Sequence, residues 1–279
     1  MLILFQSYEI IFINDGSSDN TFNVMLDMKS KYKGVRVLNL SRNFGKESAL
    51  TAGLERAKGE VAIPIDVDLQ DPPELIVDFI KKWEEGYDVV LAKRVDHSSD
   101  SFLKKFTAEL FYRVYNKISD VSMPSNVGDF RLISRRVIEA LKMLPENQRF
   151  MKGLFAWVGF KTTYIEYKRE SRVAGKSSFN AWKLWNFAID GITSFSTVPL
   201  KVWLYFGFII SALSFIYGSF IIIKTLIYGV DLPGYASLLT TILFLGGIQL
   251  MGIGILGEYI GRIYQESKRR PPYIIEGEY

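Results

Sequence analysis

Residues 60–74 read EVAIPIDVDLQDPPE and join the pattern of a buried strand to the start of a helix. The apolar run predicts a strand over Glu60–Asp66. Asp71 is expected to be the N-cap of the next helix, because proline follows at the first helical position and Glu74 stands at N3. A strand that leads directly into a helix is the repeating unit of an α/β fold.

The same alternation continues on both sides of this stretch. We predict strands over Tyr8–Asn14, Val35–Leu40 and Asp88–Ala92, and helices over 20–32, 46–58 and about 73–86. Strands separated by helices of this length indicate βαβ units and a mostly parallel sheet. Ligands of such sheets bind beyond the carboxyl ends of the strands, so polar residues there are the first candidates for function.

Two carboxylates, Asp66 and Asp68, stand where one of these strands ends. Mg²⁺ prefers oxygen ligands and is usually held by one or two carboxylates plus substrate phosphates. The alternative is that acidic residues only favour a turn and a helix cap. That alternative is sufficient for Asp71, but neither Asp66 nor Asp68 is needed for the cap. We therefore predict a metal and nucleotide site here, although a D-x-D pattern alone is a weak signal.

The composition excludes several classes of protein. The chain has 34 Lys and Arg against 30 Asp and Glu, and this net charge of +4 is too small to indicate a nucleic-acid partner. A charged fraction of 23% with 14% aromatics excludes a disordered chain. The absence of cysteine excludes disulfides and thiolate metal sites, and it leaves the redox compartment undetermined.

Two long uncharged runs, Val202–Ile223 and Leu232–Gly257, lie near the C-terminus. At about 1.5 Å per helical residue each can cross a hydrocarbon layer of about 30 Å. Two buried core helices in tandem are the alternative, and we favour a membrane hairpin. Met1–Gln6 does not resemble a signal peptide, since it has no basic segment or cleavage site.

Basic residues flank the predicted hairpin. Lys201 precedes it and Arg262 and Lys268–Arg270 follow it, whereas the connecting loop offers only Lys224. The positive-inside rule therefore predicts that the N-terminal domain and both termini are cytoplasmic in a multi-pass membrane protein.

Five motifs occur in order along the chain: NDGSSDNT (14–21), LSRNFGKESAL (40–50), DVDLQDPPE (66–74), NVGDFRLISRRV (126–137) and GEYIGRIYQESKRRPPYII (257–275). Together they resemble the family-2 glycosyltransferases of GT-A fold. The resemblance is closest to the bactoprenol glucosyltransferases, relatives of dolichyl-phosphate mannose synthase. It implies transfer of a sugar from a nucleotide-sugar, with UDP-glucose as the leading donor, to undecaprenyl phosphate at the cytoplasmic membrane face. The same chemistry with GDP-mannose or another nucleotide-sugar remains an alternative.

The resemblance also implies a division of the chain. Residues 1–168 would form a GT-A domain with a Rossmann-like, mostly parallel sheet, and residues 169–200 a juxtamembrane segment. Residues 201–261 would hold two transmembrane helices, and residues 262–279 a cytoplasmic tail.

On the donor side, the resemblance assigns roles position by position. Asp15 matches the residue that contacts the nucleotide base, and a turn-forming role before Gly16 is compatible with this. Asp66 and Asp68 match the metal-binding pair and Gln70 a further ligand, which implies Mg²⁺ or Mn²⁺ as cofactor.

Three basic residues are candidates for the substrate phosphates. Arg94 matches an arginine near the diphosphate, although a solvated surface arginine is the alternative. Arg42 and Lys46 lie between a strand end and a helix start, where anions often bind.

Asp129 matches the residue that the family uses as catalytic base. The acceptor phosphate has a second pKa near about 6 and is mostly dianionic at neutral pH, so it needs little deprotonation. Asp129 could instead orient the acceptor, stabilise positive charge at the sugar carbon, or accept a proton from the phosphate monoanion. Attack opposite the departing nucleotide would invert the anomeric centre in a single displacement.

Three basic residues are candidates for the acceptor phosphate. Arg172 and Lys176 match a segment near the acceptor in relatives, and a solvated charge cluster is the alternative. Lys105 lies in an amphipathic stretch over 102–114, which suits either a membrane surface or ordinary packing.

Glycines recur every seven residues at Gly247, Gly254 and Gly261 in the second apolar run. Small residues on one stripe allow close helix approach in lipid. The contact could lie within the hairpin or between copies in a homo-oligomer, and the sequence leaves both open.

The sequence departs from the family at its start. Relatives begin with a strand reading roughly VVPVYNEE, whereas this sequence starts just before the strand that follows it. We expect a truncated gene model of an active enzyme, and we predict that restoring upstream sequence would recover nucleotide binding. A truncated, non-catalytic membrane partner is the alternative, against which the intact Asp66, Asp68 and Asp129 argue.

Overall fold

The computed structural model describes residues 7–68, 70–95, 109, 112–119, 121–147, 149–167, 189–229 and 234–279. The chain divides into two compact units. The first comprises Met1–Ser194 and Arg269–Tyr279, and the second comprises Phe195–Lys268.

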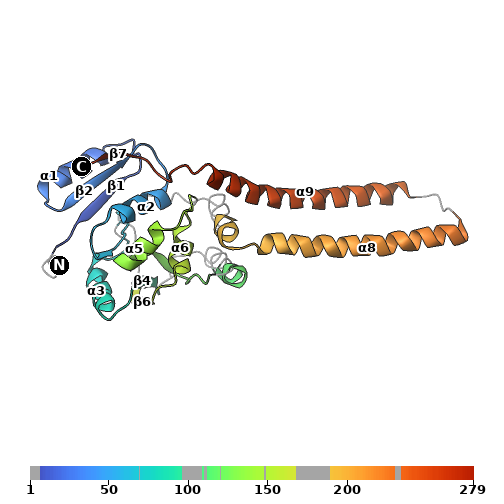
Figure 1. The fold of residues 1–279 in the computed structure, drawn as a ribbon, viewed down its shortest axis with the longest axis horizontal. Coiled ribbons are helices and arrows are strands. Elements are labelled where there is room, and N and C mark those ends of the chain that lie inside the picture. Colours follow the sequence, from blue (N-terminus) through green and yellow to red (C-terminus); the bar gives the residue numbers. More distant parts are fainter. Residues whose placement is uncertain are drawn as a thin grey trace. The chain divides into compact units, whose positions relative to one another are not determined.

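A sheet of three strands lies at one end of the first unit. Strand β1 (Ile10–Asn14) pairs in parallel with β2 (Val35–Leu40), and helix α1 (Thr21–Lys31) connects them. Strand β7 (Ile275–Glu278) pairs antiparallel with the other edge of β2 (Figure 1). The last residues of the chain therefore belong to the same sheet as the first described strand, which the sequence analysis does not predict.

A second sheet has the strand order β3-β5-β4-β6. These strands are β3 (Val61–Ala62), β4 (Val89–Arg94), β5 (Val127–Ser134) and β6 (Thr162–Tyr167). Strands β4 and β6 are parallel, whereas β5 runs antiparallel to β3 and β4. The α/β class is confirmed, and the described strands form mixed sheets in which β1 and β3 are edge strands.

Four further helices complete the first unit: α2 (Lys46–Arg56), α3 (Ile76–Glu84), α5 (Arg135–Lys142) and α6 (Met151–Trp157). Two predictions from residues 60–74 need correction. The strand is paired only over Val61–Ala62, because pairing depends on the partner β5 and not on the local apolar pattern. A short 3₁₀ turn, Pro73–Leu75, opens the next helix with Pro72 as its N-cap residue in place of Asp71. The buried Asp71 carboxylate instead accepts a hydrogen bond from the Tyr167 hydroxyl.

The two faces of β5 have different neighbours. The rings of Phe130 on β5 and Phe79 on α3 lie 4.9 Å apart in the hydrophobic core, which also contains Val90, Ala92, Leu132 and Tyr167. Because side chains alternate along a strand, Asp129 and Arg131 point to the opposite face. Helix α6 covers that face, since Arg131 packs against Phe155. This alternation brings two charged side chains of β5 to one side of the sheet.

The second unit contains α8 (Val198–Tyr228) and α9 (Tyr235–Ser267), each long and apolar enough to cross a membrane. Most of their large apolar side chains are exposed. A Cβ on Gly252 would lie 2.0 Å from Trp203 Nε1, so α8 and α9 meet closely at this glycine. Gly247, Gly254 and Gly261, by contrast, have open space at their Cβ positions among the described residues. The predicted stripe is therefore not the contact between these helices in this structure.

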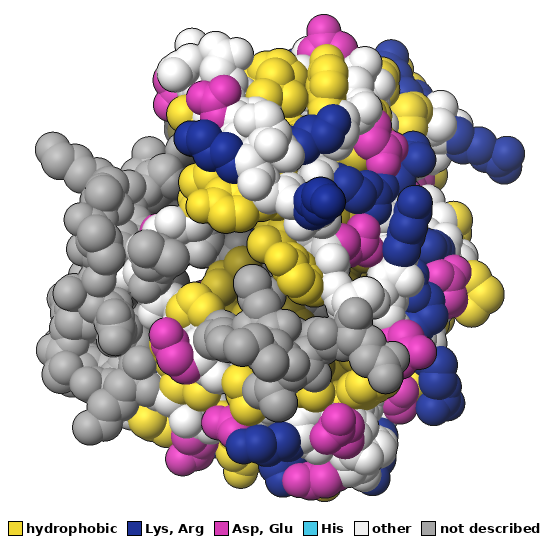
Figure 2. Space-filling view, turned by 90° about the vertical axis from the view of Figure 1, so that its left-hand side faces the viewer, with side chains coloured by type: hydrophobic (Ala, Val, Ile, Leu, Met, Phe, Trp, Pro, Cys, Tyr) yellow, Lys and Arg dark blue, Asp and Glu magenta, His cyan; other side chains and the backbone are white. Residues whose placement is uncertain are grey.

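On one face of the molecule, Lys and Arg side chains are interleaved with Asp, Glu and hydrophobic side chains (Figure 2). The field of such a mixed surface is weak, in agreement with the small net charge.

Candidate functional site

One lysine joins two carboxylates at the ends of distant strands. Nζ of Lys46 lies 2.8 Å from Oδ2 of Asp66 and 2.7 Å from Oδ2 of Asp129. Asp66 follows strand β3, and Asp129 lies near the start of β5. Three residues from separate sequence motifs are thus brought together.

Asp15 fixes the start of the helix that carries Lys46. Its two carboxylate oxygens accept hydrogen bonds from the backbone N–H groups of Phe44 (2.7 Å) and Gly45 (2.9 Å). Asp15 therefore holds the loop that enters α2.

The close approach of the two loops needs a glycine. Gly16 has φ of +66°, and a Cβ there would lie 2.4 Å from the backbone nitrogen of Asn43. Any side chain at position 16 would force this loop apart. Through Asp15 and Gly16, the end of β1 positions the first turn of α2.

Asp66, Asp68 and Gln70 lie in the turn that follows β3. The Asp66 carboxylate, which is 42% exposed, already holds the Lys46 ammonium. Oδ1 of Asp68 accepts a hydrogen bond from the backbone N–H of Gln70 at 3.2 Å. The carboxylates and the amide of this turn are hard oxygen donors, and the ion pair with Lys46 shows that the turn stabilises positive charge.

The residue types of this turn are ones that bind Mg²⁺ or Mn²⁺ when substrate phosphates supply the remaining ligands. Among the described residues, no group of three or more His, Cys, Asp or Glu side chains is arranged to hold a metal. A site with few carboxylates is what Mg²⁺ needs when substrate phosphates complete its coordination.

The charges around Asp129 keep it ionised. Burial acts to raise the pKa of Asp129, but the ammonium groups of Lys46 and Lys152 and the guanidinium of Arg131 together hold it below the ordinary value. Burial acts to lower the pKa of Lys46, and the charge of Asp129 and of Asp66 raises it overall. At neutral pH both members of the pair are therefore charged.

Glu47 is a second carboxylate of the site, which the sequence analysis does not single out. Burial, together with the negative charge of Asp129, raises the pKa of Glu47 to about 7. Its Oε2 accepts a hydrogen bond from the backbone N–H of Met151 at 3.2 Å. Glu47 thus links the first turn of α2 to the first residue of α6.

Arg131 and Lys152 are cations that the sequence analysis also leaves out. Arg131 is 4% exposed, and burial lowers its pKa to about 10. Burial also lowers the pKa of Lys152, which is half-buried near Asp129. Strand alternation from Asp129 could have indicated Arg131, whereas no local signal marks Lys152, because α6 reaches the site only through tertiary packing.

The other predicted residues are placed as follows. Arg42 is exposed, donates a hydrogen bond to the backbone oxygen of Asn43 and lies over the ring of Phe44 at 4.0 Å. Arg94 is the last residue of β4, paired in register with Tyr167. Lys105, Arg172 and Lys176 lie outside the described residues.

Comparison with known proteins identifies the family. Residues 4–142 match the model of "Glycosyl transferase family 2", and residues 198–263 match "GtrB C-terminal hairpin". The bactoprenol glucosyl transferase of Shigella phage SfV is 58% identical over 97% of this chain and 88% of its own length.

The chain belongs to glycosyl transferase family 2. Two further relatives support the assignment of this chain as a glycosyltransferase. The prophage bactoprenol glucosyl transferase homolog of Escherichia coli K12 is 56% identical over 96% of this chain and 88% of its own length. An uncharacterised glycosyltransferase of Synechocystis is 54% identical over 96% of this chain and 85% of its own length.

The crystal structure of Staphylococcus aureus TarS residues 1–349 matches 58% of this chain and 50% of its own length, with 16% identity and a TM-score of 0.39. That similarity is too low to add to the assignment.

Proposed function

We propose that this glycosyltransferase moves a sugar, in the first place glucose from UDP-glucose, onto undecaprenyl phosphate at the cytoplasmic face of the inner membrane. The observation that carries the proposal is the 58% identity to a bactoprenol glucosyl transferase, which extends through both the sheet domain and the apolar hairpin. A lipid acceptor explains why a sugar-transferring domain is joined to two helices that could span a bilayer.

The reaction is a single displacement. An oxygen of the phosphate dianion attacks the anomeric carbon, and the bond from that carbon to the diphosphate breaks with its electron pair on the departing UDP. Because the nucleophile is already ionised, Asp129 acts by orienting the acceptor and stabilising positive charge at the sugar carbon. Its low pKa, held by Lys46 and the neighbouring cations, suits this role better than that of a base. Attack opposite the leaving group inverts the anomeric configuration.

Asp66, Asp68 and Gln70 would hold the Mg²⁺ or Mn²⁺ ion, which when bound offsets charge on the leaving diphosphate. Lys46 would supply a further positive charge between this turn and Asp129. Arg94 and Arg42 would contact the donor phosphates and Asp15 the nucleotide base. On the acceptor side, Arg172, Lys176 and Lys105 would bind the lipid phosphate.

The basic flanks of the hairpin support the topology in which the domain and both termini are cytoplasmic. There the domain would have access both to nucleotide-sugars and to the phosphate end of the lipid. Homo-oligomerisation would use the exposed glycine stripe of α9, whose Cβ positions are open in this structure.

The test is a donor screen with the full chain in membranes. Radiolabelled UDP-glucose, other UDP-sugars and GDP-mannose are each supplied with undecaprenyl phosphate and Mg²⁺, and lipid-extractable label is measured. Label from UDP-glucose alone supports the proposal, and label from GDP-mannose would reassign the donor. An Asp68→Ala variant should abolish metal-dependent transfer, while Asp78→Ala, an exposed aspartate of α3, should keep it. If no donor gives a lipid-linked product, the non-catalytic partner becomes the better account.

A further inference from the structure

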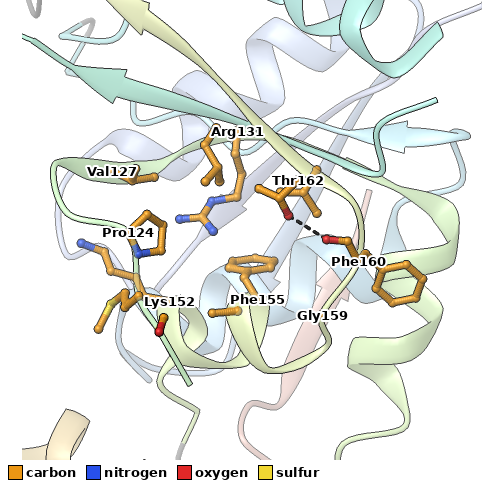
Figure 3. Close-up of a pocket in the computed structure, with 13 residues that line it drawn as sticks. Pro124, Val127, Arg131, Lys152, Phe155, Gly159, Phe160 and Thr162 are labelled. Atoms are coloured by element: carbon orange, nitrogen blue, oxygen red, sulfur yellow. Dashed lines mark hydrogen bonds between the residues drawn. The ribbon is translucent and has the colours of Figure 1, made fainter. Parts of the chain in front are cut away.

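A pocket of about 180 Å³ lies between the second sheet and α6 (Figure 3). Its walls include Val127 on β5, Met123, Pro124 and Phe155, all of them apolar. An engineered protein cavity of about 150 Å³ takes up benzene, so this pocket has room for a small ligand. The chemistry of that ligand follows from the two cations that also line it.

Arg131 reaches from β5 into this pocket. Its guanidinium lies over the Phe155 ring at 4.4 Å, and one of its terminal nitrogens donates to the backbone oxygen of Gly128 at 2.6 Å. Nε of Arg131 is buried and has no hydrogen-bond partner in the described part of the chain. A buried donor without a partner is unfavourable, and a bound acceptor would satisfy it.

Lys152 lines the same pocket from the first turn of α6. Among the residues that the structure describes, it forms no ion pair within 4 Å, whereas Asp129 is already paired with Lys46. Figure 3 shows the Arg131 guanidinium and the Lys152 side chain lying to either side of Pro124. The pocket thus combines two cations with apolar walls, which suits an anion attached to a short hydrocarbon.

The charge balance of the surrounding network favours the same ligand. Lys46, Arg131 and Lys152 are positive, while Asp66 and Asp129 are negative. Glu47, the remaining carboxylate, is held partly protonated near neutral pH by its burial. An anion bound beside Arg131 and Lys152 would compensate the excess positive charge.

We propose that this pocket binds the phosphate end of an isoprenyl phosphate, with Arg131 and Lys152 on the phosphate and the apolar walls on the first carbons of the chain. This inference rests on the proposed function and adds Arg131 and Lys152 to Arg172, Lys176 and Lys105 as residues that bind the acceptor phosphate. Asp129 and Arg131 alternate on one face of β5, so a phosphate held here lies beside the carboxylate proposed to stabilise the sugar.

The experiment measures binding to the full chain in detergent, with geranyl phosphate as the probe and geraniol, inorganic phosphate and UDP as comparisons. Lys152→Met removes the charge and keeps the length of the side chain. Ala156→Leu fills the pocket without changing charge, because Ala156 also lines it. Lys142→Met, on the exposed face of α5, is the matched control, and thermal unfolding checks that every variant is folded.

We expect geranyl phosphate to bind the unaltered chain, and both pocket variants to weaken it at least tenfold, the equivalent of about 1.4 kcal/mol. Lys142→Met should bind it within about twofold of the unaltered chain, and the affinity for UDP should stay within about twofold in all three variants. Several outcomes overturn the proposal: no binding of geranyl phosphate, unchanged binding in both folded pocket variants, or equal binding of geraniol. Inorganic phosphate that binds as tightly as geranyl phosphate and is lost in Lys152→Met would assign the pocket to free phosphate and overturn the lipid assignment.

The same variants separate this inference from the proposed function. If the unaltered chain transfers sugar to undecaprenyl phosphate while the pocket variants bind geranyl phosphate normally, the function stands and the inference fails. If the pocket binds geranyl phosphate as expected but no donor gives a lipid-linked product, the subsite stands and the proposed reaction fails.

Discussion

The ammonium of Lys46 lies 2.7 Å from Oδ2 of Asp129, and the same nitrogen lies 2.8 Å from Oδ2 of Asp66. One side chain thereby joins the turn proposed to hold the metal ion and donor diphosphate to the carboxylate proposed to face the sugar carbon. A substitution of Lys46 should therefore affect both the turn that contains Asp66 and the position of the Asp129 carboxylate.

We expect Lys46→Met to lower the rate of sugar transfer about tenfold to a hundredfold, because it removes a positive charge from between two carboxylates. Lys46→Arg keeps the charge and should recover part of the rate. The measurement is kcat for lipid-linked product, with Lys31→Met on the exposed end of α1 as control. A normal kcat in Lys46→Met would show that this ion pair has no part in the reaction.

Glu47→Gln should stabilise the protein at alkaline pH and have little effect at acid pH. The pKa of Glu47 is about 7 in the folded chain and near 4.5 when unfolded, so the folded state holds its proton more tightly. The stability from this proton is present below about pH 4.5 and is lost as the pH rises to about 7. Glutamine mimics the protonated form at every pH.

Because Glu47 is only partly buried, we expect a gain of about 1–2 kcal/mol for Glu47→Gln at pH 8 relative to pH 5. This corresponds to about 3–5 °C in the unfolding temperature. Scanning fluorimetry in detergent at the two pH values checks it, with Glu84→Gln on the surface of α3 as control. A difference between variant and parent that does not change with pH would contradict the raised pKa of Glu47.

Gly16→Ala should be far more harmful than Gly86→Ala. Both glycines have positive φ, +66° and +90°, so both substitutions incur a backbone penalty of about 1–2 kcal/mol. At Gly16 the new Cβ would meet backbone, at 2.4 Å from Asn43 N, whereas at Gly86 no atom of the described residues lies within 4 Å of it. We expect Gly16→Ala to lower the unfolding temperature several degrees more and to weaken UDP binding, because it displaces the loop that Asp15 holds. Equal effects of the two substitutions would show that the two loops are not in close contact.

Removal of Ile275–Tyr279 should destabilise the first unit. Strand β7 pairs with β2, and Glu278 forms an ion pair with Arg36, which also pairs with Glu9. Glu278→Gln should cost less than about 1 kcal/mol, since partly exposed ion pairs contribute little. Deletion also removes backbone hydrogen bonds such as Val37 N to Tyr279 O at 3.0 Å, and should lower the unfolding temperature more. An unchanged unfolding temperature after deletion would mean that β7 adds nothing to the sheet.

Local sequence signals were sufficient for much of this fold. The β-branched run Val35–Leu40 is strand β2 with the predicted bounds, and the helix that begins at Lys46 does so in the structure. These elements follow from side-chain periodicity and from glycine positions, which act over a few residues.

Elements that depend on distant partners were not predictable in this way. Strand β7 reads IEGE, a polar tail in isolation, and becomes a strand only because β2 offers a free edge. Lys152 and Glu47 join the site through the packing of α6 against α2, where Glu47 accepts the N–H of Met151. Asp66 and Lys46 could be selected as candidates from their places at a strand end and at a helix start. Asp129 lies on β5, a strand that the local pattern did not predict, and only the resemblance to the family pointed to it.

The proposed catalytic role of the Asp129 carboxylate is tested most directly by comparing Asp129→Asn with Asp78→Asn. The measurement is the transfer of labelled glucose from UDP-glucose to undecaprenyl phosphate. Asparagine keeps the shape of the Asp129 side chain and removes the charge that Lys46 holds in place. We expect the unaltered chain and Asp78→Asn to form lipid-linked glucose at similar rates, and the rate of Asp129→Asn to fall at least a hundredfold. A folded Asp129→Asn variant that transfers glucose at the rate of the unaltered chain would contradict that role.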